Sequence, residues 1–315
     1  MAKPTIALCI PAYKAEEHLP RLLESARQQN PPFDEIIVCV DASPDATADV
    51  ARTFGVTVIV NETNLGCSAS KNRALEAAIS DWVHFHDADD ILLPDFTREA
   101  HDWMGLDNPP DVVIMGFEYL DFLTREHLTT GLQSDEQLSS DPVGYAIRNK
   151  LPNFGIYQRE KISALGGFDV DPATLYNEDV AFHLKLALAG CSFRASSKVT
   201  SLNYRHGNSM SSANATRCEL AHSEVMRRAA EKTGERYTGD IAARLWGAAT
   251  MLASHQTWSD VDRVLALAKQ IYPGIPSGQS KSFYRLCAII GAPAAFRLRE
   301  RSIRLLKPQL REKSL

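Results

Sequence analysis

The stretch WVHFHDADDILLPDF, residues 82–96, combines an apolar run with a crowded group of carboxylates. Trp82–His86 is predicted to be a buried strand, and Asp87, Asp89 and Asp90 follow it directly. Carboxylates this close raise one another's pKa. A hard divalent cation removes that penalty, because carboxylate oxygens are the ligands that Mg²⁺ and Mn²⁺ prefer. The pattern therefore predicts either a metal site at a strand end or an acidic turn that caps the next helix.

Two histidines lie within the same predicted strand. His84 and His86 alternate with Val83 and Phe85, so their side chains share one face of the sheet. They could approach the metal from that face, or they could be packed strand residues, and the sequence leaves both interpretations open.

The segments on either side of this stretch alternate between strand and helix signals. Predicted strands are Thr5–Ile10, Glu35–Val40, Val56–Val60 and Val112–Phe117, and predicted helices are Glu16–Gln29, a helix from Ser43 or Asp45 to Phe54, Ser68–Ile79 and one beginning near Pro94. This alternation predicts an α/β fold with a mostly parallel central sheet flanked by helices. Ligands in such sheets bind beyond the carboxyl ends of the strands. That rule selects Pro11–Glu16, Asp41–Asp45 and Asp87–Asp90.

The rest of the chain divides into two parts. Residues 118–158 are expected to form short strands and loops, followed by a helix over Glu178–Ala189 and short strands over Ser192–Ser196 and Lys198–Tyr204. From about residue 215 the pattern is helical, with helices predicted over Glu219–Lys232, Ile241–His255, Val261–Ile271, Phe283–Gly291 and Ala294–Leu306. We expect an α/β domain over residues 1–214 and a helical region over residues 215–315.

Composition limits the classes of protein that fit. Of the 315 residues, 44% are hydrophobic and 23% charged, an ordinary globular balance. The net charge of −5 argues against a nucleic-acid partner bound through an overall basic field. No secretory signal and no run of ~18 apolar residues is present. The six cysteines form no C-x-x-C pair and are interpreted as reduced thiols. These observations predict a cytoplasmic protein.

Six segments in a fixed order carry a family resemblance. They are IPAYKAEEHLPRLLES (Ile10–Ser25), VDASPDAT (Val40–Thr47), NLGCSASKNRAL (Asn64–Leu75), HDADD (His86–Asp90), GGFD (Gly166–Asp169) and NEDVAFHLKLALAG (Asn177–Gly190). Together they resemble the inverting glycosyltransferases of family 2, which have the GT-A fold, a Rossmann-like sheet with a DXD metal motif. The similarity covers about Thr5 to Ser211. Lys14 stands where Asn is common, and Val40 replaces the first Asp of the second motif.

The resemblance implies a site for a nucleotide-sugar donor. Asp41 would hold the nucleobase or ribose, because a carboxylate accepts hydrogen bonds from N–H and O–H groups. Tyr13 would stack on the base, Glu16 would bind the nucleoside, and Lys71 would place its ammonium near the diphosphate. The implied donor-binding residues are Pro11, Tyr13, Glu16, Asp41, Lys71, Asp87 and Ala88. A helix cap at Asp41 and a solvated surface lysine at Lys71 are the plainer alternatives.

The resemblance also implies a catalytic base and a metal site. An inverting transfer is a single displacement, which needs a carboxylate on the acceptor side to take the hydroxyl proton. Asp179 is the expected base, with Glu178 on the acceptor side, and an ordinary helix N-terminal acid is the alternative. Asp89 would coordinate Mn²⁺ or Mg²⁺, and His206 would be either a further ligand or an ordinary loop histidine.

The expected function is a metal-dependent transfer of a sugar from a nucleoside-diphosphate donor to a hydroxyl of a glycan or lipid-linked acceptor, in surface polysaccharide or glycolipid synthesis. The resemblance favours a UDP-sugar as the donor and leaves guanosine and thymidine donors open. A non-catalytic sugar-nucleotide-binding subunit is one alternative. A nucleotidyltransferase is another, although it would usually carry a Gly-rich basic loop where Pro11-Ala12-Tyr13-Lys14 stands. Arginines in Ala294–Leu306 could contact an anionic membrane surface. The same arginines could instead form a solvated helix face or the contact surface of a homo-oligomer.

Overall fold

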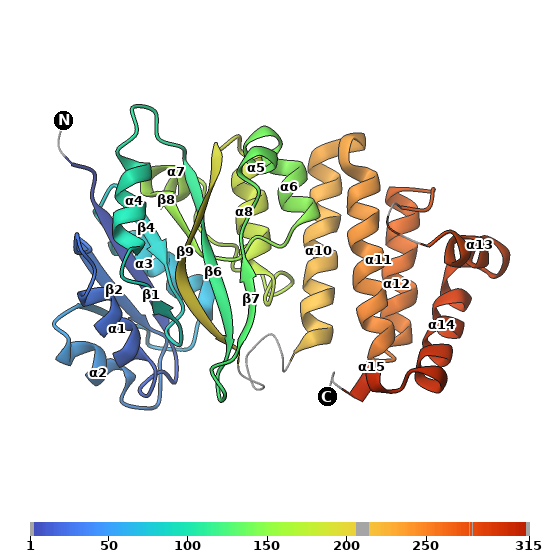
Figure 1. Ribbon diagram of the computed structural model, residues 1–315, viewed down its shortest axis with the longest axis horizontal. Helices are drawn as coiled ribbons and strands as arrows, with labels where there is room; N and C mark the ends of the chain where they lie inside the picture. The colour runs from blue at the N-terminus through green and yellow to red at the C-terminus, as the bar shows by residue number, and fades with distance from the viewer. Residues whose placement is uncertain (1–2, 206–213, 277, 279, 313–315) are drawn as a thin grey trace. The chain divides into compact units, whose positions relative to one another are not determined.

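The computed structural model describes residues 3–205, 214–276, 278 and 280–312. The chain forms two compact units (Figure 1). The first unit comprises Met1–Ala146, Lys150–Val170 and Glu178–Ser209, and the second comprises Ile147–Asn149, Asp171–Asn177 and Met210–Leu315.

A nine-stranded sheet organises the first unit, in the order β3-β2-β1-β4-β8-β6-β9-β5, with β7 paired to β6. The strands are β1 (Ile6–Ala12), β2 (Glu35–Val40), β3 (Thr57–Val60), β4 (Trp82–Phe85), β5 (Ile91–Leu92), β6 (Val112–Asp121), β7 (His127–Gly131), β8 (Gly155–Gln158) and β9 (Phe193–Arg205). Strands β1 to β4, β6 and β9 all run in one direction, and β5, β7 and β8 oppose them. The predicted α/β class with a mostly parallel sheet is confirmed.

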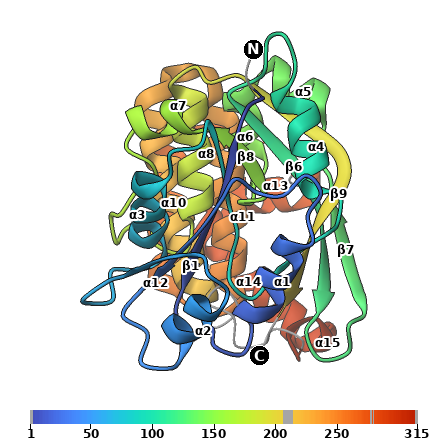
Figure 2. The same cartoon turned by 90° about the vertical axis from the view of Figure 1, so that its left-hand side faces the viewer.

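Helices cover both faces of this sheet. On one face, alternate residues of β1 (Ile6, Leu8 and Ile10) share a core with α1 (Leu19–Arg27) and α4 (Phe96–Met104). On the other, Phe85 of β4 contacts the ring of Phe182 from α8 (Glu178–Leu188), and α3 (Cys67–Ala77) packs on β1 and β2. Figure 2 shows α1 and α3 on opposite sides of β1. Strands buried on both faces explain the nearly continuous apolar runs in the sequence.

Several predicted elements differ from those observed. Strand β1 passes through Pro11 to Ala12 instead of ending before the proline. One continuous strand, β9, replaces the two short strands predicted over residues 192–204. The middle of the chain, predicted as short strands and loops, also holds α5 (Asp135–Ser140) and α6 (Pro142–Arg148). Ser134 caps α5 by accepting a hydrogen bond from the Gln137 N–H. The remaining short helices are α2 (Thr47–Thr53) and α7 (Arg159–Ala164).

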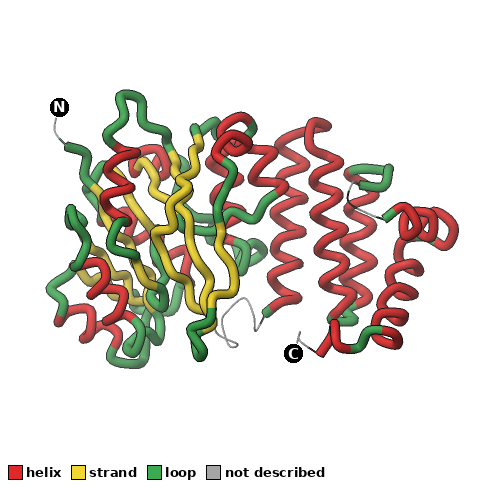
Figure 3. The backbone as a smooth tube through the Cα atoms, in the orientation of Figure 1, coloured by secondary structure: helices red, strands yellow, loops and turns green. Residues whose placement is uncertain are grey.

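The second unit is helical (Figure 3). Its helices are α10 (Ala215–Thr233), the 3₁₀ turn η1 (Gly234–Tyr237), α11 (Thr238–Ser254), α12 (Trp258–Ile271), α13 (Lys281–Ile290), α14 (Ala292–Leu306) and α15 (Gln309–Glu312). The rings of Trp246 and Phe283 lie 5.6 and 5.3 Å from that of Phe296 and join α11, α13 and α14. Within the described part of the chain, every helix is too short or too polar to cross a bilayer.

Candidate active site

The carboxyl ends of β1, β2 and β4 meet at one edge of the sheet. Ala12 of β1 lies opposite Val40 of β2, and Cys9 lies opposite Phe85 of β4. The loops that follow these strands therefore emerge side by side, as expected of parallel strands. They carry Tyr13 after β1, Asp41 after β2 and Asp87 after β4. The three loops selected from the sequence are thus neighbours in space.

Lys71 lies at the centre of this edge. Its side chain is 1% exposed, and its Nζ atom lies 3.5 Å from Asp87 Oδ1 and 3.6 Å from Asp179 Oδ1. Burial alone would lower the pKa of Lys71, but the carboxylates of Asp87, Asp179 and Glu178 raise it well above its usual value. The lysine is therefore a permanent buried cation. It links the loop after β4 to the first turn of α8, two segments far apart in the sequence.

Asp179 combines a buried oxygen with an accessible one. Its Oδ1 atom is buried toward Lys71 and accepts no hydrogen bond from a described residue, while 32% of the side chain remains exposed. Burial raises the pKa of Asp179 to about 7, with Lys71 opposing the rise and Glu178 and Asp87 adding to it. Glu178, beside it, is 7% exposed. A carboxylate with this pKa can take up a proton near neutral pH.

Two carboxylates of the acidic loop after β4 have different surroundings, because Asp90 is bonded within the fold and Asp89 is partly exposed. Asp90 is 1% exposed, and it accepts hydrogen bonds from Asn203 Nδ2 at 2.6 Å and from the Tyr204 N–H at 3.0 Å. It therefore ties the loop to β9. Burial, Asp89 and Asp87 raise the pKa of Asp90 well above its usual value. Asp89 is half-buried, and burial together with Asp87 raises its pKa as well.

Crowded carboxylates of this kind suit a cation, and the residues near them limit its ligands. Within the described ranges, no three His, Cys, Asp or Glu side chains are grouped to hold a metal ion. The predicted ligand His206 lies outside the described residues. Of the two predicted metal ligands, Asp89 and His206, the structure therefore describes Asp89.

The carboxylate of Asp41 is buried and accepts three hydrogen bonds from nearby residues of the chain. The side chain is 4% exposed, its Oδ1 atom accepts from Asn61 Nδ2 at 2.7 Å and from the Leu65 N–H at 2.8 Å, and its Oδ2 atom accepts from the Gly66 N–H at 2.8 Å. These bonds hold the turn that leads into α3. Asp41 consequently positions the helix that carries Lys71, whatever it contributes to ligand binding.

The loops after β1 and β2 are also bonded to each other. Glu16 Oε2 accepts from the Ala46 N–H at 2.8 Å, and the Lys14 N–H donates to Ser43 Oγ at 2.7 Å. Tyr13 is 47% exposed, so its ring is open to a ligand. The two other predicted donor-binding residues are less accessible. Pro11 is buried in β1, and Ala88 is 8% exposed.

His84 of β4 and His86, which follows the last residue of that strand, form a chain of hydrogen bonds, and the His84 ring packs against Phe96 of α4. His84 Nδ1 lies 2.8 Å from the Gly155 carbonyl, so this nitrogen donates, and His84 Nε2 accepts from His86 Nδ1 at 2.9 Å. The exposed fractions are 0% and 1%. Burial lowers the pKa of His86 to about 3, so it stays neutral. The pair is packed in the core.

A further network behind Asp179 was not predicted from the sequence. His183 Nδ1 lies 2.7 Å from the Asp179 backbone carbonyl, and His183 Nε2 lies 2.8 Å from the Tyr157 hydroxyl, which is 3.2 Å from Asn153 Oδ1. Burial lowers the pKa of His183 to about 4. The network anchors the first turn of α8 to β8. The spacing of four residues between Asp179 and His183 was the available signal.

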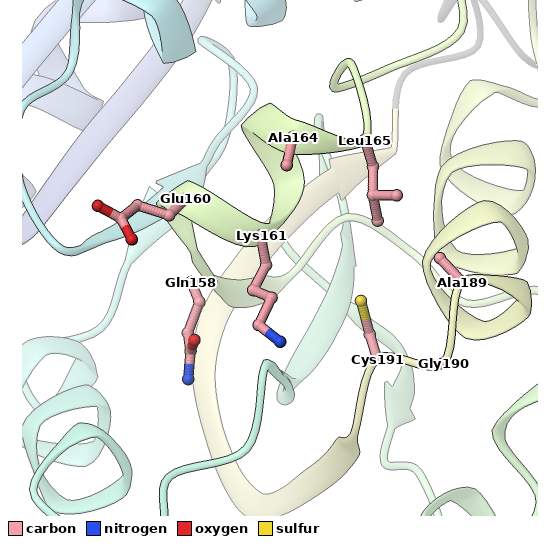
Figure 4. A pocket seen from close by; sticks show the side chains of 8 residues that line it. All are labelled: Gln158, Glu160, Lys161, Ala164, Leu165, Ala189, Gly190 and Cys191. Atoms are coloured by element: carbon pink, nitrogen blue, oxygen red, sulfur yellow. The ribbon is translucent and has the colours of Figure 1, made fainter.

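A separate hollow of about 440 Å³ lies near the amino-terminal end of β4 (Figure 4). Gln158 lines it and pairs with Trp82, the first residue of β4, whereas Asp87 follows the last residue of that strand. Lys161 and Cys191 line it as well. This hollow is distinct from the candidate site.

The sequence is similar to those of known glycosyltransferases. The family model described as glycosyl transferase family 2 matches residues 7–166. An uncharacterized glycosyltransferase of Haemophilus influenzae is 35% identical over 185 residues, which cover 58% of this chain and 61% of that protein. A putative teichuronic acid biosynthesis glycosyltransferase of Bacillus subtilis, TuaG, is 31% identical over 107 residues, covering 32% of this chain and 42% of its own length. The chain thus spans less than two thirds of these relatives.

Solved structures share the fold. Residues 1–349 of S. aureus TarS, in complex with UDP-GlcNAc, align with a TM-score of 0.73 at 21% identity over 96% of this chain and 92% of that chain. The mannosyltransferase PcManGT from Pyrobaculum calidifontis, in complex with GDP-Man and Mn²⁺, aligns with a TM-score of 0.57 at 17% identity, over 97% of this chain and 88% of that chain. At these identities the likeness concerns the fold, GT-A. The family model covers half of the sequence, and the chain belongs to glycosyl transferase family 2.

Proposed function

We propose that this chain is an inverting glycosyltransferase that moves a sugar from a nucleoside-diphosphate donor to a hydroxyl acceptor. The observation that carries the proposal is the buried Lys71, whose ammonium lies within 3.6 Å of both Asp87 and Asp179. It brings the acidic loop after β4 and a carboxylate that is about a third exposed and has a suitable pKa to one place. A non-catalytic binding subunit would need no such carboxylate.

Asp179 is the proposed catalytic base. Its carboxylate takes the proton of the acceptor hydroxyl while that oxygen forms its bond to the anomeric carbon of the donor. The bond from the anomeric carbon to the diphosphate breaks in the same step, so the configuration inverts. Lys71 keeps a useful fraction of Asp179 ionised near neutral pH, because its charge opposes the effect of burial on the pKa of Asp179. Glu178 would line the acceptor side.

The donor would bind along the three loops at the carboxyl edge. Tyr13 offers an exposed ring for the base. Glu16 and Asp41 offer carboxylate oxygens with remaining lone pairs, and Pro11 and Ala88 would supply backbone contacts. Lys71 is 1% exposed and would act on the diphosphate as a fixed charge from behind Asp87. A UDP-sugar is the proposed donor, supported by the UDP-GlcNAc complex of TarS, and the GDP-Man complex of PcManGT is the main alternative.

A divalent cation, Mn²⁺ or Mg²⁺, is the proposed cofactor. Burial and the neighbouring carboxylates raise the pKa of both Asp89 and Asp90, and a cation bound here would relieve the repulsion between these carboxylates. Asp89 would hold the ion, with His206 as the proposed second ligand and the donor phosphates completing the shell, an arrangement common for these ions. When bound, the cation would neutralise charge on the departing diphosphate. PcManGT was solved with Mn²⁺.

The acceptor is proposed to be a hydroxyl of a surface polysaccharide or a lipid-linked glycan. The name of the relative TuaG, which refers to teichuronic acid biosynthesis, supports that class. We further propose that residues 1–214 form the catalytic domain and that residues 215–315 form an accessory region.

The experiment that tests this function combines stereochemistry with one substitution. Proton NMR of the first product should show an anomeric configuration opposite to that of the donor. Asp179→Asn should lower kcat by about 10³-fold, the range for loss of a general base. Asp49→Asn is the matched control, because Asp49 is an exposed carboxylate of α2 with 80% side-chain exposure. A product with retained configuration, or an unchanged kcat for Asp179→Asn, would contradict the proposal.

A further inference from the structure

Positive charge is concentrated in the last helices of the chain. Residues 281–315 contain nine Lys and Arg and two Asp and Glu, a net charge of +7. The other 280 residues contain 25 Lys and Arg and 37 Asp and Glu, a net charge of −12. An anionic surface would therefore attract this segment and repel the rest, which would orient the molecule on that surface.

Helix α14 is apolar on two opposite sides. One side packs into the second unit, with Ala295, Phe296 and Glu300 each no more than 3% exposed. A surface helix normally presents polar residues on the opposite side. Here Leu298 and Leu305, seven residues apart and thus on one side of the helix, are 48% and 80% exposed. The outer side therefore also carries exposed apolar side chains.

Further exposed aliphatic residues lie at the end of α14 and on the helices that precede and follow it. Leu306 is 79% exposed and Leu310 of α15 is 54% exposed, while Ile289, near the end of α13, is 80% exposed. The three helices α13, α14 and α15 follow one another at the end of the second unit (Figure 1). Single exposed aliphatics are normal, but several on consecutive helices indicate an interaction surface.

The cations in these helices are only partly neutralised. Arg297 pairs with Asp262 at 2.7 Å, and Arg304 and Arg311 both pair with Glu300, at 2.9 and 2.7 Å. Arg285, Arg301 and Lys307, by contrast, make no ion pair with any residue that the structure describes. Arg301 lies between Leu298 and Leu305 along the outer side of α14. Cationic and apolar side chains thus share one surface.

We propose that this C-terminal surface, made of Ile289, Leu298, Arg301, Leu305, Leu306, Lys307 and Leu310, docks on an anionic lipid bilayer. Leucines would enter the boundary between headgroups and acyl chains, while the cations contact lipid phosphates. A nucleic acid or an acidic polymer would match the charge but leave the leucines in water. A second copy of the chain would bring its own +7 segment against this one. The bilayer satisfies both the charge and the apolar area.

Co-sedimentation of the full chain with lipid vesicles tests the proposal without any donor or acceptor, and therefore independently of the proposed function. We expect binding to vesicles of equal parts phosphatidylcholine and phosphatidylglycerol, weakened by salt, and about tenfold weaker binding to phosphatidylcholine alone. The double variant Leu305→Gln/Leu306→Gln should weaken binding about tenfold. Its matched control is Ile79→Gln/Leu123→Gln, because these aliphatics of the first unit are 82% and 87% exposed.

A second pair of variants separates charge from apolar contact. Arg301→Gln/Lys307→Gln should weaken binding to the anionic vesicles about tenfold and reduce its salt dependence. Arg52→Gln, an arginine of α2 with 57% side-chain exposure, should change nothing. The proposal is overturned if the chain does not sediment with anionic vesicles, or if both surface variants bind as the controls do. It is also overturned if sedimentation velocity without lipid shows that the wild type is a dimer and that Leu305→Gln/Leu306→Gln is a monomer.

Discussion

Replacing Lys71 by Met should shift the pH dependence of catalysis, because Lys71 sets the protonation of Asp179. The substitution removes the ammonium but keeps a side chain of similar length in a buried position. Asp179 then loses the one cation within 3.6 Å of its buried oxygen among the described residues, while the carboxylates of Glu178 and Asp87 stay near it. Both consequences favour the protonated form of Asp179.

The size of the shift follows from the distance. At an effective dielectric constant of about 20, a unit charge 3.6 Å away interacts with ~4.6 kcal/mol, equivalent to ~3 pKa units. Because about a third of Asp179 is exposed, we halve this figure to ~1.5 units to allow for solvent screening. The pKa of Asp179 is about 7 in the intact site. At pH 7 the ionised fraction would then fall about 15-fold.

The assay is the pH profile of kcat/KM, whose acid limb reports the base in the free enzyme. We expect a limb near pH 7 for the wild type, which moves upward by ~1.5 pH units in Lys71→Met. Lys71→Arg is the matched control, since it keeps the charge, and its limb should stay near that of the wild type. An unmoved limb in Lys71→Met would show that Lys71 does not control the catalytic base.

Three further outcomes are expected. Asp89→Asn should raise the Mn²⁺ concentration for half-maximal activity at least about tenfold, because one of the few proposed ligands is lost; equal metal dependence would remove Asp89 as a ligand. Asp41→Ala should lower the free energy of unfolding in urea by about 3 kcal/mol, because the N–H groups of Leu65 and Gly66 and the Asn61 amide lose their acceptor; a loss below about 0.5 kcal/mol, as for an exposed position, would disprove this role. Between pH 7.5 and 5.5 the free energy of unfolding of the wild type should fall by about 1.4 kcal/mol more than that of His86→Gln. The reason is that His86 has a lowered pKa in the native state, so it is protonated in this range only in the unfolded state. Parallel curves of unfolding free energy against pH would rule this out.

The parallel part of the fold could be predicted because its strands are buried on both faces. Strand β2 has the predicted bounds, Glu35–Val40, and β4 lies within one residue of its prediction. The insertion of β8 between β4 and β6 could not be predicted, since a four-residue strand carries too little local signal to specify its partners. Helix α5 was not predicted, because it too is short. Its six residues lie between Gly131 and Pro142, which read as loop residues.

The candidate site was predicted in its parts but not in its connections. The strand-end loops identified Asp41 and Asp87 as members of one region, and the family resemblance added Asp179. The burial of Lys71 could not be foreseen, because lysine is rarely buried unless it is paired and its partners come from distant segments. The same holds for the three donors that occupy Asp41. Such contacts depend on which loops meet, and that is decided by the tertiary fold.

A crystal structure of the chain with Mn²⁺ and a non-hydrolysable UDP-sugar would show where each group stands. We expect the cation on Asp89 and the uracil ring of the donor beside Tyr13 and Asp41. The exposed oxygen of Asp179 should face the anomeric carbon from the side opposite the diphosphate. A donor bound away from this edge of the sheet, or Asp179 on the same side as the departing diphosphate, would contradict the proposed mechanism.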